Sequence, residues 1–159
     1  MIRIQEHRKV NMAGSDSDCV LDKLSFISFN CEYADSARLT FLQDLFTKCD
    51  FLLIQEHGLF QRQFGWFDQL GDNVVTHGVS AMDDTVCLRG RPHGGVMIIW
   101  KANIKATVTP VCHESKRFCA VIIDTGLSKF LLVCIYMPCD DDRPNHNLVE
   151  YVSVLNDIN

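Results

Sequence analysis

Residues 50–58 read DFLLIQEHG, and this stretch decides the fold. Four apolar residues (51–54) run directly into Gln55, Glu56 and His57, and a glycine then ends the run. A short, continuous apolar run is typical of a strand that is buried on both faces of a sheet. We therefore predict a central strand that delivers a carboxylate and an imidazole at its carboxyl end.

The segment before this strand completes a strand-helix-strand unit. LSFISFN (24–30) predicts a largely buried strand that ends at Asn30, and the apolar spacing of 35–50 predicts a helix capped by Asp35 or Ser36. The two strands of such a unit lie parallel in one sheet. Asn30 and Glu56 should then emerge together at the carboxyl edge, where open α/β sheets bind ligands.

The rest of the chain predicts more strands than helices. We expect a short aromatic-rich helix or helical turn at 59–70 and a loop at 71–93. We also expect a C-terminal helix that begins near Pro144. Short connectors between apolar runs favour antiparallel hairpins. The four runs that we expect to pair in this way are 95–100, 104–111, 118–124 and 129–137.

Composition narrows the class of protein. The length of 159 residues suits one globular domain, and the formal net charge of −5, with no densely basic segment, does not predict a large nucleic-acid-binding surface. A local DNA-binding face stays open. Eight cysteines include no CxxC pair, and no histidine pair has zinc-finger spacing, so we expect no structural zinc.

No segment has the length and apolarity of a membrane span or of a signal peptide. We therefore expect an intracellular protein, nuclear or cytoplasmic, that has no membrane partner and keeps its thiols reduced. Residues 1–22 are polar and predict a disordered tail.

Polar residues at the ends of strands predict the chemistry. Asn30 and Glu56 follow two parallel strands, and Tyr136 ends a later apolar run. Mg²⁺ prefers oxygen ligands and often takes only one or two carboxylates, with water and substrate phosphate completing its shell. A tyrosine hydroxyl and an amide nearby can hold phosphate oxygens. The pattern predicts metal-assisted phosphoester hydrolysis with Mg²⁺, for which Mn²⁺ could substitute.

Four motifs occur in an order that matches a known family. They are SFN (28–30), LIQEHG (53–58), GGVMIIW (94–100) and IYMP (135–138). Together they resemble the endonuclease/exonuclease/phosphatase (DNase I-like) superfamily over residues 24–158. The sequences of these motifs are most similar to those in the endonuclease domain of non-LTR (LINE-type) retrotransposon polyproteins.

The resemblance implies a fold and roles for individual residues. The fold would be an α/β fold, the N-terminal part of a four-layer α/β/β/α sandwich with mixed sheets. Glu56 matches the metal-binding glutamate, Asn30 the asparagine that positions metal and phosphate, and Tyr136 the tyrosine near the phosphate. DNA would be the substrate, and a reverse transcriptase domain the partner in the parent polyprotein.

The same resemblance implies residues that this sequence does not contain. The family's Asp-x-Asn pair, a further acidic residue and an Asp-His base come from later motifs, and no GDFN or SDH occurs here. We therefore expect residues 23–159 to form a partial domain, truncated before those motifs and inactive alone. We also expect a sheet without its packing partner and marginal stability.

Several alternatives stay open. The chain could be a non-catalytic remnant or interaction module, or it could act on another phosphoester such as an abasic site or a phosphoinositide.

His57 is interpreted as a side chain behind the metal ligands or facing DNA rather than as the base. Arg91 and His93, with Arg89, are candidate substrate contacts. The three aspartates at 140–142 are interpreted as a solvated loop that caps the following helix.

Overall fold

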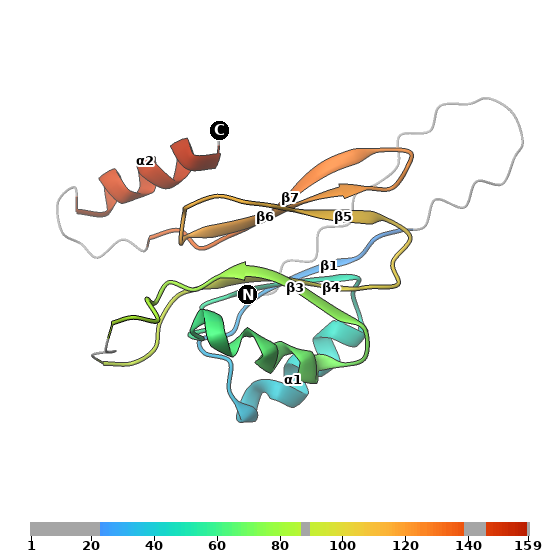
Figure 1. Cartoon of the computed structure of the whole chain (residues 1–159), viewed down its shortest axis with the longest axis horizontal. Helices are drawn as coiled ribbons and strands as arrows, with labels where there is room; N and C mark the ends of the chain where they lie inside the picture. The colour runs from blue at the N-terminus through green and yellow to red at the C-terminus, as the bar shows by residue number, and fades with distance from the viewer. Residues whose placement is uncertain (1–22, 87–89, 139–145, 159) are drawn as a thin grey trace, which may run out of the picture.

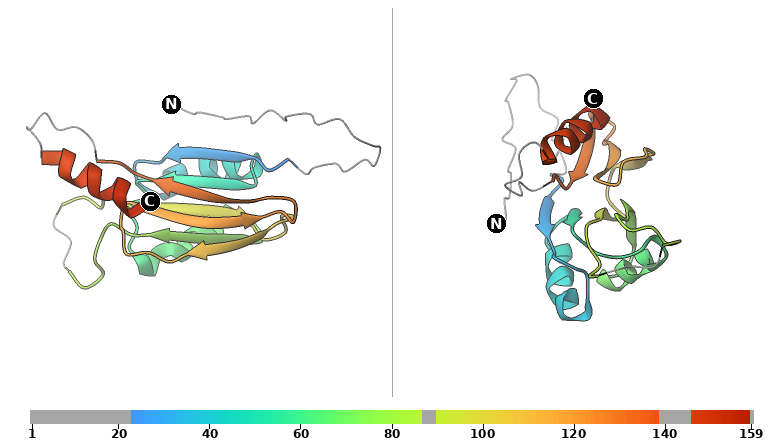
Figure 2. Two further views of the ribbon diagram at one scale, coloured as in Figure 1. Left: turned by 90° about the horizontal axis from the view of Figure 1, so that it is seen from above. Right: turned by 90° about the vertical axis from the view of Figure 1, so that its left-hand side faces the viewer.

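The computed structural model describes residues 23–86, 90–138 and 146–158. Two β-sheets are stacked, with two helices on the outer side of the first sheet and a third beyond the second (Figures 1 and 2). The elements are β1 (Phe26–Asn30), α1 (Ser36–Thr47), β2 (Phe51–Gln55), the 3₁₀ helix η1 (Gln61–Leu70), β3 (Val74–Val79), β4 (Val96–Lys101), β5 (Thr107–Val111), β6 (Phe118–Asp124), β7 (Lys129–Ile135) and α2 (His146–Ile158).

The first sheet is mixed and has the strand order β1-β2-β4-β3. As predicted, β1 and β2 are parallel, and Asn30 lies opposite Gln55 at their carboxyl ends. The Ser25 hydroxyl donates to Asp50 Oδ2 over 2.7 Å at the other end of the pair, which fixes this register. The Asp35 carboxylate accepts a hydrogen bond from the Arg38 amide and caps α1, as its position predicts.

The first four residues of β2 are apolar because both faces of the strand are covered. Leu52 and Ile54 join a core with α1 and η1, whereas Phe51 and Leu53 join a second core that faces the other sheet. Alternate side chains of a strand point to opposite faces, so each face needs its own apolar set. The expectation that the first sheet lacks a packing partner is therefore wrong.

The second sheet has the order β5-β6-β7 and is antiparallel throughout. It supplies Cys119, Val121, Ile123 and Cys134 to the core between the sheets. The mixed first sheet, the antiparallel second sheet and the flanking helices confirm the predicted α/β class.

Two details differ from the sequence prediction. Residues 71–93 are not all loop, because 74–79 form β3, an edge strand whose residues are all half-buried. β4 does not form a hairpin with β5, because β2 and β3 already occupy both of its edges. The chain must therefore leave β4 for the second sheet.

Helix α2 agrees with the predicted C-terminal helix and lies near the second sheet (Figure 1). Its Val154 is buried, whereas Leu148, Val149, Tyr151, Val152 and Leu155 remain exposed. The aspartates at 140–142, Arg89, Pro144 and the tail at 1–22 lie outside the described residues. None of the described helices is long and apolar enough to cross a membrane.

Candidate metal and phosphate site

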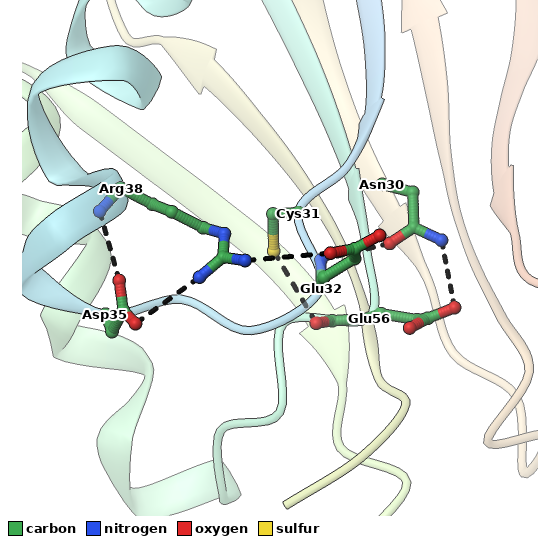
Figure 3. Close-up of polar contacts among 6 residues, drawn as sticks. All are labelled: Asn30, Cys31, Glu32, Asp35, Arg38 and Glu56. Atoms are coloured by element: carbon green, nitrogen blue, oxygen red, sulfur yellow. Dashed lines mark hydrogen bonds and ion pairs between the residues drawn. The ribbon is translucent and has the colours of Figure 1, made fainter. Parts of the chain in front are cut away.

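The carboxyl ends of β1 and β2 bring Asn30 and Glu56 into direct contact. Asn30 Nδ2 donates to Glu56 Oε1 over 2.9 Å, and Asn30 Oδ1 accepts from the amide of Glu32 over 3.1 Å (Figure 3). The amide of Asn30 is thus oriented by its own turn and in turn orients the carboxylate. The structure confirms the predicted meeting of these two residues at one edge of the sheet.

The backbone of Glu56 adopts a conformation that side chains rarely accept. Its φ is +55°, and Glu32 (φ +50°) and Tyr33 (φ +110°) on the facing turn are also left-handed. Such residues persist where surrounding contacts hold them, often at functional sites. Here the amide of Tyr33 donates to the carbonyl of Glu56 over 2.8 Å, and that of Ala34 donates to the carbonyl of His57 over 2.9 Å. The turn after β1 therefore clamps the turn after β2.

His57 lies beneath this edge and is fully buried. The amide of Leu59 donates to Nδ1 over 3.0 Å, so Nδ1 carries the lone pair and Nε2 carries the proton. Nε2 lies 3.2 Å from the carbonyl oxygen of Val79 and donates to it. Burial lowers the pKa of His57 from 6.5 to about 4. The ring is therefore a neutral, fixed group that does not reach the surface.

The predicted glycine turn before β4 packs against the His57 ring. A Cβ on Gly95, which has a φ of +84°, would lie 2.4 Å from His57 Nε2. The neighbouring Gly94 accepts from the amide of Gly58 over 2.9 Å, which ties this loop to the turn that carries Glu56. Arg91 and His93 are exposed on the same loop. Contact of Arg91 and His93 with substrate stays a prediction.

Tyr136 comes to the same end of the molecule from the second sheet. Gln55 Nε2 donates to Cys134 Sγ over 3.2 Å, and Cys134 Sγ donates to the carbonyl of Ile54 over 3.4 Å. These contacts place the end of β7 against the end of β2. Tyr136 lies two residues beyond Cys134, and Glu56 one beyond Gln55.

Arg117 is a basic residue that the sequence analysis did not single out. Its guanidinium carbon lies 5.9 Å from the centre of the Tyr136 ring, and its carbonyl accepts from the Tyr136 amide over 2.9 Å. The sequence does contain a signal for Arg117. It directly precedes β6, and β6 pairs with β7, the strand that leads to Tyr136. Arg117 brings positive charge beside the Tyr136 ring.

The donor set suits a hard divalent cation. Glu56 Oε1 accepts a hydrogen bond from Asn30 Nδ2, which orients the carboxylate. Asn30 Oδ1 keeps one lone pair beyond the bond from Glu32. One carboxylate and one amide oxygen fit Mg²⁺, which usually keeps several waters and a substrate phosphate. No group of three or more His, Cys, Asp or Glu is placed to hold a metal within the described ranges.

Comparison with solved structures shows which fold this is. The endonuclease domain of TRAS1, a telomere-specific non-LTR retrotransposon, matches 82% of this chain with a TM-score of 0.53 and 15% identity. An AP endonuclease, LMAP from Leishmania major, matches 71% with a TM-score of 0.49 and 19% identity. TDP2 from C. elegans matches 85% with a TM-score of 0.47 and 14% identity.

The match covers 52% of the TRAS1 domain, 40% of the AP endonuclease and 42% of TDP2. The chain therefore spans about half the length of the solved structures that it resembles. No model of a known protein family matches the sequence, and a comparison with curated proteins finds no match.

Proposed function

We propose that this chain, whose fold is that of the DNase I-like superfamily, is part of a divalent-metal-dependent phosphodiesterase domain that acts on DNA. One observation carries the proposal: the 2.9 Å hydrogen bond between Asn30 and Glu56 at the carboxyl edge of parallel strands. The TRAS1 domain, which has the same fold, is named an endonuclease. A linked reverse transcriptase belongs to the proposal through the sequence resemblance alone.

Glu56 and Asn30 would hold the cation, and their orientation is set before any ligand binds. Mg²⁺ or Mn²⁺ at this point would supply stabilisation of the charge on the phosphate and on the leaving oxygen. The φ of +55° at Glu56 and the Asn30 amide fix the direction of the carboxylate, so little reorganisation accompanies binding.

Tyr136 and Arg117 would hold the phosphate. The tyrosine hydroxyl can donate to a non-bridging oxygen, and the guanidinium beside its ring adds positive charge. Arg91 and His93 on the neighbouring loop would contact the DNA backbone further along the strand. An intracellular setting belongs to the proposal through the sequence prediction alone.

His57 is not the base that activates water. Both ring nitrogens are engaged by the backbone, and the side chain is fully buried. A general base must reach the proton that it removes. The chain would therefore contribute the cation- and phosphate-holding part of the site, and the base would come from elsewhere in the complete domain.

DNA binding and cleavage, measured together, test this proposal. Binding of a labelled duplex should strengthen when Mg²⁺ is added, and Glu56→Gln should remove that dependence, whereas Asp44→Asn on the exposed end of α1 should not. Supercoiled plasmid should show no nicking above the Glu56→Gln control. Duplexes with an abasic site and phosphoinositide micelles, used as competitors, separate the alternative substrates.

Two results would count against the proposal. If Mg²⁺ dependence is the same in the wild type and Glu56→Gln, Glu56 does not hold the cation. If the wild type nicks plasmid and Glu56→Gln does not, the site is complete, and the statement that the base comes from elsewhere is wrong.

A further inference from the structure

We propose that His57 is the positioning residue for Glu56, and that the hydrogen bond to its Nδ1 holds the turn that aims the carboxylate at the cation. This inference rests on the proposed function, because it assigns a role toward the cation that Glu56 would hold. His57 is not a catalytic residue, since its ring is fully buried below the edge of the sheet.

The two hydrogen bonds of the His57 ring differ in how far apart their partners lie in the sequence. The bond from the Leu59 amide to Nδ1, over 3.0 Å, spans two residues and shapes the turn locally. The bond from Nε2 to the carbonyl of Val79, over 3.2 Å, ties the turn to the end of β3. Because one bond is local and the other crosses the sheet, suitable substitutions can separate them.

The turn needs such support because two of its residues are left-handed. Glu56 has a φ of +55° and Gly58 a φ of +62°, on either side of His57. The glycine accepts this conformation without cost, but the glutamate does not. If the turn relaxed, Glu56 would rotate its backbone and point its carboxylate away from Asn30.

The surroundings of the ring keep it in one orientation. The rings of Phe64 and Phe67 meet it edge to face, with centroids 5.3 Å and 6.0 Å away, and Gly95 packs against the Cε1–Nε2 side of the ring. In this orientation the ring presents Nδ1 to the Leu59 amide and Nε2 to the Val79 carbonyl. The packing therefore fixes His57 Nδ1 as the acceptor of the hydrogen bond from the Leu59 amide.

Two variants separate positioning from packing. His57→Asn places an amide oxygen where Nδ1 lies, so it can accept from the Leu59 amide in an Asx turn while the tie to Val79 is lost. His57→Phe keeps the ring and loses both hydrogen bonds. His77→Phe, the same change on β3 of the same sheet, is the matched control. His57→Leu replaces His57→Phe if the latter does not fold.

The readout is Mn²⁺ affinity, measured by electron paramagnetic resonance of free Mn²⁺ on folded protein. We expect His57→Phe to weaken binding by about 10–100-fold, the usual effect of losing a group that orients a ligand. His57→Asn should stay close to the wild type although its Tm falls, and His77→Phe should not change affinity. Wild-type affinity in folded His57→Phe, or equal loss in His57→Asn, would overturn the inference.

A second readout keeps the inference distinct from the proposed function. If wild type and Glu56→Gln bind Mn²⁺ equally, the proposed function fails. The Cα chemical shift of Glu56 still reports whether its φ is positive. We expect the left-handed shift in the wild type and in His57→Asn but not in His57→Phe. The same shift in all three would show that the ring nitrogens do not hold the turn.

Discussion

The Cα of Gly95 lies against the ring of His57, so closely that a Cβ there would fall 2.4 Å from both Nε2 and Cε1. The contact explains the glycine at 95, and a Cβ on the preceding Gly94 would lie 2.7 Å from the Cβ of Ala81. Both glycines have a positive φ. The contact with His57 also ties the loop with Arg91 and His93 to the turn that carries Glu56.

Gly95→Ala should lower the free energy of unfolding by more than the conformational strain of a positive φ alone would. Gly126 has a similar φ of +78° and nothing within 4 Å of an added Cβ, so Gly126→Ala should cost about 1 kcal/mol in free energy of unfolding. Gly95→Ala should cost about 2 kcal/mol more because the ring must move. Urea denaturation of both variants measures the difference, and equal costs would refute the close contact.

The free energy of unfolding should decrease as the pH is lowered from 6.5 to about 4, the range set by His57. The unfolded chain takes up this proton near pH 6.5, whereas the folded chain resists it down to about pH 4 because burial lowers the pKa of His57. The unfolded state therefore binds more protons in this window, and stability rises with pH. The shift corresponds to about 3 kcal/mol of unfolding free energy lost by pH 4.

Comparison with His57→Asn isolates this contribution, because burial also lowers the pKa of His77 and His113 and their effects have the same sign. Urea denaturation at several pH values should give a shallower slope for the variant between pH 6.5 and 4. A slope as steep as that of the wild type would contradict a neutral, buried His57.

Tyr136→Phe should weaken cation-dependent DNA binding without changing Mn²⁺ affinity. Loss of one hydrogen bond to a phosphate oxygen costs about 1 kcal/mol, or about fivefold in affinity. Fluorescence anisotropy of a labelled duplex measures the change, and Tyr151→Phe on exposed α2 is the matched control. Equal DNA affinity of the two variants would remove Tyr136 from the phosphate site.

Thiol reactivity should follow burial. Among the cysteines that the structure describes, Cys112 is exposed, and Cys31, Cys49, Cys119 and Cys134 are buried. Burial raises the pKa of Cys31 and Cys49 to about 11, and a hydrogen bond with Cys134 together with burial raises that of Cys119.

Because the thiolate is the reactive form, brief alkylation of the native protein should label Cys112 first. Mass spectrometry of digested samples identifies the labelled residues. Equally rapid labelling of Cys119 or Cys134 would show that the core between the sheets opens readily.

Local sequence signals were sufficient for the β1–α1–β2 unit. The apolar run of 51–54, the Asp35 cap and the helical spacing all indicate the same structure, so the sequence alone places Asn30 and Glu56 at one edge of the sheet. The TRAS1 domain confirms the DNase I-like fold that the four motifs indicated.

Long-range packing decided what the sequence could not predict. β3 has half-buried residues throughout and a glycine at 78, so no clear alternation marks it as a strand. The change of sheet after β4 depends on which strand edges are already occupied. The left-handed φ of Glu56 goes with a contact from the turn after β1, where the Tyr33 amide donates to the Glu56 carbonyl, and the apolar run before Glu56 gives no signal of it.

The central claim is that Asn30 and Glu56 share one divalent cation, and paramagnetic broadening by Mn²⁺ tests it most directly. In a ¹⁵N-labelled sample with substoichiometric Mn²⁺, the side-chain amide of Asn30 and the backbone amide of Glu56 should broaden first, followed by that of Tyr136. Excess Mg²⁺ should reverse the broadening, and Glu56→Gln should abolish it. Broadening centred elsewhere, or unchanged in Glu56→Gln, would contradict the claim.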